Sequence, residues 1–287
     1  MAEKFKDLLI ETPIKKDKAG NVVSGTIDGN YAIISINRPD KLNALTPETV
    51  QQIALALESF EVDPDVRCIV LRGVKEFTKK PAFSAGADLS SPMGKGIKPN
   101  VAWHMSHAMR IRLKYYDWID NFTKPLIAAV DGFALGGGCE LVLCCDIVIA
   151  TKRSRFGFPE INRGIIPGNG GCTRMARRIG VNRALRMAMF GEEHSAETMQ
   201  EWGLVSWVTE EGEPFEQIIN EKAKWFGTAA TSALYVIKKC VKFGTQVPVD
   251  IALNLEELGF GLNSTAQDVK EGINAFLKKT KPEYKGF

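Results

Sequence analysis

Two glutamates, Glu140 and Glu160, stand twenty positions apart on either side of a mostly apolar stretch of the chain. Two carboxyl groups that share a partly dry site resist joint ionisation, so one of them is expected to keep a proton near neutral pH. Such a pair can work as general acid and general base. Each residue alone has an ordinary interpretation, Glu140 as an acid at a helix start and Glu160 as a loop residue after Pro159. It is the pairing that indicates acid–base chemistry.

Three glycines, Gly136 to Gly138, precede Glu140 and the helix that we expect over about residues 137–145. They lack the lysine and hydroxyl residue of a P-loop, and the chain contains no G-x-G-x-x-G, so neither common nucleotide-binding motif is present. Glycine lets backbone come close to a bulky group, and a helix start offers free N–H groups. That combination can stabilise an oxygen that gains negative charge during a reaction.

A second turn of small residues, FSAGADL at 83–89, has the same character. We expect it to present one backbone N–H, and we expect Asp88 to cap the start of a helix. Two such turns could hold a carbonyl oxygen as it becomes an enolate. The alternative is that both are tight strand-to-helix turns with no chemical role, since glycine often marks backbone geometry alone.

Short apolar runs bounded by turn residues predict buried strands at four places, 31–36, 67–72, 125–130 and 145–150. Thr46, Pro47 and Glu48 predict the start of a helix that ends near residue 61, and a second helix is expected over 101–122. The sequence therefore indicates an α/β fold.

From about residue 213 only helical patterns follow, and the last one begins with Ser264 and Gln267 at capping-box spacing. We therefore expect an α/β core with the active site over 1–212 and a C-terminal helical region over 213–287.

The composition is that of an ordinary globular protein, with 45% hydrophobic and 25% charged residues. A net charge of +3 gives no electrostatic argument for nucleic acid or an anionic membrane as a partner. No apolar run approaches the roughly 20 residues of a membrane helix. The six cysteines form no C-x-x-C pair, so we expect buried free thiols. With no signal-peptide pattern at the start of the sequence, the expected location is the cytoplasm.

The three histidines do not indicate a metal site. His104 and His107 could face one way on a helix, but no third ligand is spaced for a metal. His194 lies in the polar segment GEEHSAE and is expected to be solvated.

Five segments together resemble the crotonase family, also called the enoyl-CoA hydratase/isomerase superfamily. They are NRPDKLNAL (37–45), AFSAGADL (82–89), KPLIAAVDGFALGGGCELVLCCDIVIA (124–150), FGFPEINRGIIPGNGG (156–171) and EGINAFLKKTKP (271–282). The resemblance implies a spiral of repeated β-β-α units with a C-terminal helical region. Asp131 departs from the asparagine of many relatives, and Phe158 stands where some hydratases have a polar residue, a change that could reshape the acyl pocket.

The resemblance also implies an acyl-CoA thioester as substrate, with its carbonyl oxygen between the backbone N–H groups of Ala87 and Gly137. Glu140 and Glu160 match the two glutamates of the hydratases. In that family picture Glu140 takes a proton from the water that attacks C3, and Glu160 delivers a proton to C2. No metal or redox cofactor is implied, because CoA is part of the substrate.

Further positions implied for CoA binding lie in two parts of the chain, Ala44, Ala85, Asp88 and Leu89 near the oxyanion turn, and Phe276 and Lys279 near the C-terminus. The last two reach CoA in relatives, often that of a neighbouring subunit. Since relatives form trimers or dimers of trimers, a homotrimer or a dimer of trimers is expected.

The implied activity is that of an enoyl-CoA hydratase, or equally a 3-hydroxyacyl-CoA dehydratase, on a short substrate such as crotonyl-CoA or 3-hydroxypropionyl-CoA. Two alternatives stay open. A double-bond isomerase of the same fold can work with one carboxylate, and a non-catalytic acyl-CoA-binding or RNA-binding relative needs neither. Residues 1–24 and 90–118, where such folds usually encode substrate choice, give no readable signal.

Overall fold

The computed structural model describes residues 5–91, 97–98 and 100–286. Residues 1–4 and 92–96 belong to the two segments expected to encode substrate choice, and they lie outside the described residues. In the part of the chain that is described, no helix has both the length and the apolar character needed to cross a membrane.

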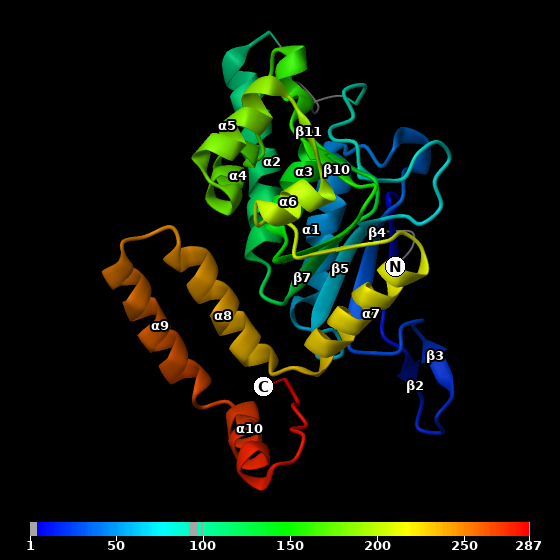
Figure 1. The fold of residues 1–287 in the computed structure, drawn as a ribbon. Coiled ribbons are helices and arrows are strands. Elements are labelled where there is room, and N and C mark those ends of the chain that lie inside the picture. The colour runs from blue at the N-terminus through cyan, green and yellow to red at the C-terminus, as the bar shows by residue number, and fades with distance from the viewer. Residues whose placement is uncertain (1–4, 92–96, 99, 287) are drawn as a thin grey trace.

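Two β-sheets run through the core (Figure 1). The larger contains, in spatial order, β1 (Leu8–Glu11), β4 (Tyr31–Ile36), β5 (Cys68–Gly73), β7 (Leu126–Val130), β9 (Ile147–Thr151) and β12 (Trp207–Thr209). Only β1 runs antiparallel to its neighbour. The four predicted strands correspond to β4, β5, β7 and β9, with ends shifted by at most two residues. Nearly all of their residues are buried, as expected for parallel strands covered on both faces.

The smaller sheet contains, in spatial order, β11 (Glu193–Ser195), β10 (Arg155–Gly157), β8 (Phe133–Leu135) and β6 (Ala82–Ser84). β10 pairs antiparallel with β11, whereas β6, β8 and β10 are mutually parallel. A separate hairpin near the N-terminus joins β2 (Lys15–Lys16) and β3 (Val22–Ser24). Strands of two or three residues carry too little pattern to be predicted from sequence.

The chain passes repeatedly from the larger sheet to the smaller one and then into a helix. β5 and β6 lead to α2 (Ala102–Asn121), and β7 and β8 lead to α3 (Gly137–Cys144). β9 and β10 lead through the 3-10 helix η3 (Pro159–Arg163) to α4 (Gly171–Ile179) and α5 (Val181–Phe190). The predicted series of β-β-α units is therefore confirmed. Because β6, β8 and β10 are parallel, the residues that follow each of them gather at one edge of the smaller sheet.

Helix α1 (Pro47–Glu61) begins as predicted. Thr46 Oγ1 accepts a hydrogen bond from Thr49 N (3.0 Å), and Thr46 N donates to Thr49 Oγ1 (3.3 Å). Pro47 occupies the first turn, where its missing N–H costs nothing. The short helices η2 (Pro39–Lys41) and α6 (Ala196–Glu201) complete the core.

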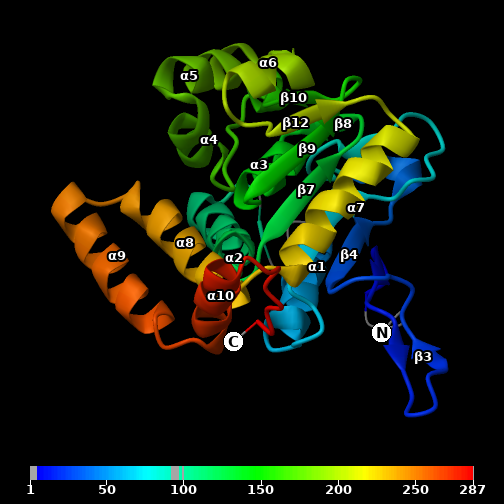
Figure 2. The same ribbon diagram turned by 60° about the horizontal axis from the view of Figure 1, so that its bottom comes forward.

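Four helices follow the last strand, α7 (Glu213–Thr228), α8 (Thr231–Gly244), α9 (Val249–Asn263) and α10 (Gln267–Lys278). α7 lies across the larger sheet (Figure 2) and buries Phe215, Ile219 and Ala223 against it. α8 and α9 form a hairpin that extends away from the sheets, with α10 beyond it (Figure 1). The assignment of residues 213–287 to assembly and CoA contact stays a prediction, although α7 packs as part of the core.

The capping box expected at Ser264 and Gln267 is wrong. α9 continues through Asn263, so Ser264 ends that helix and its Oγ donates to Gly261 O (2.7 Å). α10 begins at Gln267 with Ala266 in the capping position and no side-chain cap.

Two expectations about burial also need correction. Cys68, Cys139, Cys144 and Cys145 are buried free thiols as predicted, but Cys172 is exposed and Cys240 is half-buried. His194 is buried rather than solvated, because it pairs in β11 with β10 and its ring lies 4.6 Å from that of Trp202. Burial lowers the pKa of this histidine.

Candidate active site

In the turn after β6, the backbone N–H of Ala87 donates to no described residue. Leu45 N donates to Gly86 O (2.7 Å) and Asp88 N donates to Leu45 O (2.9 Å), so the intervening N–H of Ala87 takes no part in this bridge. Gly137 stands at the first position of α3, where a helical N–H has no acceptor within the helix. Among the described residues neither N–H donates a hydrogen bond.

The two N–H groups belong to segments that lie against each other. A Cβ atom added to Gly137 would lie 3.6 Å from Ala87 N, and one added to Gly86 would lie 3.6 Å from Gly137 N. Beside them is a small hollow. Its lining consists of Leu45, Thr46, Pro47, Val50, Ala87, Arg112, Tyr116, Gly137 and Asn169. Tyr116 Oη donates to Gly137 O (3.1 Å) and so fixes the start of α3 against α2.

Gly136 and Gly138 are required because neighbouring atoms leave no room for a Cβ atom at either position. Gly136 has a φ of 51°, and a Cβ there would lie 2.7 Å from Glu160 Oε1. At Gly138 a Cβ would lie 2.4 Å from the backbone oxygen of Ser84. The run therefore lets α3 start against β6 and beside the second glutamate.

Glu140 is 1% exposed and is held by three donors. Its Oε1 accepts from Asn169 N (2.6 Å) and Gly171 N (3.0 Å), and its Oε2 accepts from Asn169 Nδ2 (2.8 Å). Burial raises the pKa of Glu140, while these hydrogen bonds and the charge of Arg174 act in the opposite direction. All three partners donate, so they favour the ionised carboxylate.

Glu160 has a different environment in the first turn of η3. It is half-buried, and among the described residues its buried Oε2 has no hydrogen-bond partner. Burial, with a smaller contribution from the charge of Glu140, raises the pKa of Glu160 to about 7. With one carboxylate held by three donors and the other leaving one buried oxygen without a partner among the described residues, the pair can accept a proton at one position and supply one at the other.

The sequence profile of the family described as enoyl-CoA hydratase/isomerase matches residues 26–286. The chain belongs to this family. It is 35% identical over 254 residues to the 2,3-dehydroadipyl-CoA hydratase of Escherichia coli K12, covering 88% of this chain and 94% of that one. It is 34% identical over 260 residues to the short-chain-enoyl-CoA hydratase of Clostridium acetobutylicum, covering 89% and 94%. A solved enoyl-CoA hydratase structure from Geobacillus kaustophilus HTA426 superimposes with a TM-score of 0.82 at 35% identity, covering 92% and 98%.

The structure brings together the first group of residues that the enoyl-CoA hydratase/isomerase family implies for CoA. Ala85 N donates to Leu42 O (3.0 Å), and the carbonyl of Ala44 accepts from Arg38. Asp88 does not cap a helix. It forms an ion pair with Arg38 (2.9 Å) and accepts from Ser90 N and Oγ in a turn, because the chain does not enter a helix there. Leu89, beside it, is exposed.

The second group lies elsewhere in the chain. Phe276, 80% exposed, is on α10, and Lys279 ends that helix with a φ of 55°. α10 lies at the end of the C-terminal region, away from α3 (Figure 1). Within one chain these residues are therefore not part of the cavity beside Glu140.

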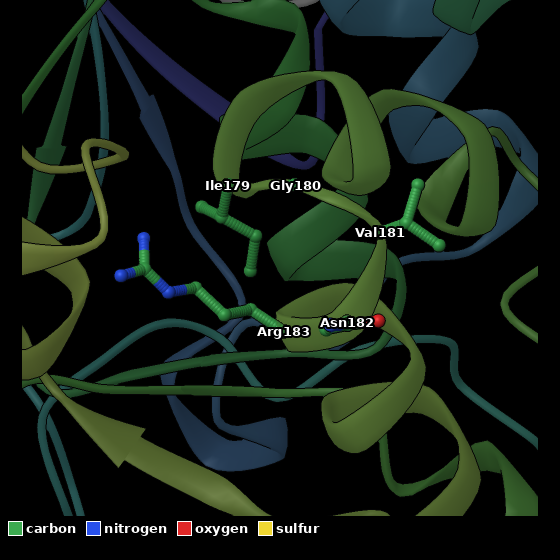
Figure 3. A pocket seen from close by; sticks show the side chains of 5 residues that line it. All are labelled: Ile179, Gly180, Val181, Asn182 and Arg183. Carbon is green, nitrogen blue, oxygen red and sulfur yellow. The ribbon is translucent and has the colours of Figure 1, made fainter.

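A second hollow lies between α4 and α5 (Figure 3). It is lined by Ile179, Gly180, Val181, Asn182 and Arg183 and contains no carboxylate. Neither Glu140 nor Glu160 lines either hollow, but Asn169 lines the one beside Ala87 and Gly137 and donates hydrogen bonds to the Glu140 carboxylate.

Asn169, Gly171 and Tyr116 were not predicted as site residues. Asn169 lies in the motif PGNGG of the resembling segment 156–171, but its spacing from Glu140 gives no sign of contact. Tyr116 lies on the helix predicted over 101–122, where it could have been taken for an ordinary core residue.

Proposed function

We propose that this protein is an enoyl-CoA hydratase, which adds water reversibly to a trans-2-enoyl-CoA to give a 3-hydroxyacyl-CoA. The observation that carries the proposal is the unlike hydrogen bonding of one buried and one half-buried carboxyl group, beside two backbone N–H groups that donate to no described residue. Family membership and the hydratase names of relatives support it. It is a hydro-lyase reaction and needs no cofactor beyond the CoA that the substrate carries.

In the proposed mechanism Glu140 is the base and Glu160 the acid. Glu140, ionised and fixed by its three donors, takes a proton from water as the water oxygen attacks C3. Glu160, whose pKa is raised to about 7, can hold a proton near neutral pH and delivers it to C2. In the reverse direction the two residues exchange roles, so the same site dehydrates a 3-hydroxyacyl-CoA.

The N–H groups of Ala87 and Gly137 are proposed to bind the thioester oxygen. As C3 is attacked, negative charge moves onto that oxygen, and donors already in place stabilise it without reorganisation. Ala44, Ala85, Asp88 and Leu89, around the same turn, are proposed to contact the CoA portion.

A short acyl chain is proposed, such as crotonyl-CoA or, in the dehydration direction, 3-hydroxypropionyl-CoA. The short-chain-enoyl-CoA hydratase among the relatives supports it. The relative from Escherichia coli is named for a longer, dicarboxylic acyl group, so a substrate panel must include both kinds.

The test is the ultraviolet absorbance of the conjugated enoyl thioester. Adding the protein to crotonyl-CoA is expected to remove this absorbance at a catalytic rate. Absorbance that appears from a 3-enoyl-CoA, with little hydration of crotonyl-CoA, would indicate the isomerase. If neither substrate changes, a non-catalytic binding role replaces the proposal.

We also propose a cytoplasmic homotrimer or dimer of trimers. Many large apolar side chains are exposed over α8, α9 and α10, a pattern that marks protein contact surfaces. They include Ile237, Val241, Val249, Leu258, Phe260, Leu262, Ile273, Phe276 and Leu277. In such an assembly Phe276 and Lys279 could reach the CoA of a neighbouring subunit.

For this assembly we expect sedimentation at the mass of three or six chains, and we expect Phe276→Ala to raise KM for crotonyl-CoA several-fold with little change in kcat. Phe77→Ala is the matched control. Phe77 is also exposed, but it lies between β5 and β6, outside the C-terminal helical region. A monomer in which Phe276→Ala leaves KM unchanged would contradict both parts of the proposal.

A further inference from the structure

The loop 167–171 supplies every hydrogen bond that the side chain of Glu140 accepts from the described residues. Two of the three donors are backbone N–H groups, those of Asn169 and Gly171. The direction of the Glu140 carboxylate therefore depends on how firmly this loop is held.

Arg174 holds the loop from the first turns of α4. Its Nη1 donates to Asn169 O (2.9 Å). At Gly170, where φ is 101°, a Cβ would lie only 2.0 Å from this nitrogen, so the guanidinium packs directly on the glycine backbone. The other side of the guanidinium faces α2, where Nε donates to Asp120 Oδ2 (2.9 Å) and Nη2 to Asp117 Oδ1 (2.6 Å).

Asp120 also accepts from the C-terminal region. Lys242 of α8 donates to Asp120 Oδ1 (2.8 Å) and to Asp120 O (2.8 Å). Burial opposes ionisation of Asp120, but Lys242 and Arg174 hold its pKa below the ordinary value. One half-buried carboxylate thus joins two cations from different helices, and removing one cation leaves the remaining charges poorly compensated.

Lys242 also contacts the helix that carries Glu140. Its Nζ donates to the carbonyl of Cys144 (3.1 Å), the last residue of α3, and forms an ion pair with Asp146 (3.0 Å). A cation at this end of a helix satisfies a free carbonyl and the negative end of the dipole. Lys242 is therefore linked to Glu140 along two routes, through α3 and through the loop.

We propose that Lys242, Asp120 and Arg174 are positioning residues that fix the 167–171 loop on Glu140, so that the contacts of Lys242, and not the docking of α8 in general, set the geometry of the base. This inference rests on the proposed role of Glu140 in hydration. None of the three needs to touch the substrate.

Lys238 provides a matched control on the same helix. It lies one turn before Lys242, is 8% exposed, pairs with Asp146 (2.7 Å) and donates to Lys124 O (3.0 Å). It anchors α8 to the core but contacts neither Asp120 nor Arg174. Lys238→Met therefore weakens docking while leaving the route to the loop in place.

We expect Lys242→Met and Asp120→Asn each to lower kcat for crotonyl-CoA hydration by about 10-fold to 10²-fold, with KM changed less than about threefold, because small misplacements of a catalytic group are costly. Lys238→Met should lower the melting temperature but leave kcat within about twofold of wild type. Equal losses of kcat in Lys238→Met and Lys242→Met, or no loss in Lys242→Met, would overturn the proposal. If Lys242→Met does not fold, the same comparison of kcat is made between Asp120→Asn and Lys238→Met, and an unchanged kcat in Asp120→Asn would overturn the proposal.

Hydrogen exchange at the amides of Asn169 and Gly171 gives a readout that does not need activity. These N–H groups bond Glu140, so they should exchange faster in Lys242→Met and Asp120→Asn but not in Lys238→Met. Unchanged exchange in the first two variants would refute the positioning role. If the wild-type protein fails to hydrate crotonyl-CoA while the exchange pattern appears, the proposed function fails and the positioning role stands.

Discussion

Glu140→Gln and Glu160→Gln are each expected to slow crotonyl-CoA hydration by about 10²-fold or more, with KM changing far less, because general acid–base groups contribute on that order to rate. A glutamine keeps the volume and one acceptor oxygen but cannot exchange a proton in the reaction. The measurement is kcat and KM from the loss of enoyl absorbance, with folding followed by circular dichroism.

The hydrogen bonds of Glu140 explain why a glutamine at this position should leave the local structure intact. The amide oxygen can keep the two backbone donors, Asn169 N and Gly171 N, that now meet Oε1. The amide nitrogen would then face Asn169 Nδ2, and a flip of the Asn169 amide presents its oxygen instead. Since that oxygen has no partner at present among the described residues, the flip breaks no other hydrogen bond.

The double variant separates the hydratase from the isomerase. The effects of two residues that act together in one reaction are not additive, so the double variant should fall well short of the product of the single effects. An isomerase would keep nearly full activity toward a 3-enoyl-CoA in one of the single variants. Wild-type hydration in Glu160→Gln would show that the two-carboxylate assignment is wrong.

Local features of the fold could be predicted because short-range physics decides them. The apolar runs of β4, β5, β7 and β9 are buried on both faces, and Thr46 caps α1 from three residues away. The errors have equally local causes. Ser264 fits a cap at the start of α10 by spacing, but α9 continues through Asn263, so Ser264 ends that helix instead.

The hydrogen bonds that hold the site residues in place could not be predicted, because they join residues that are far apart in the sequence. Asn169 donates to Glu140, which is 29 residues away in the sequence, and Lys242 donates to Asp120, which is 122 residues away. His194 shows the same limit, since a polar neighbourhood in sequence becomes a buried one when β11 pairs with β10. The two glutamates were found because the apolar sequence between them predicted the burial that raises the pKa of each carboxyl group.

Ala87→Pro is expected to lower kcat by about 10²-fold to 10³-fold, the usual effect of losing one oxyanion donor. Proline deletes the N–H that is proposed to bind the thioester oxygen. It removes no hydrogen bond of the resting protein, because the bridge to Leu45 uses Gly86 O and Asp88 N. The fold should therefore survive, which near-ultraviolet circular dichroism and the melting temperature can check.

Ala87→Ser is the control, because it adds one atom at an exposed position and keeps the N–H. It should retain most of the wild-type kcat. An equal loss in both variants, with the fold intact, would show that the size of the side chain matters and not the N–H. Full activity in Ala87→Pro would instead leave Gly137 as the only N–H proposed for the oxyanion, and one donor of the pair would have to be reassigned.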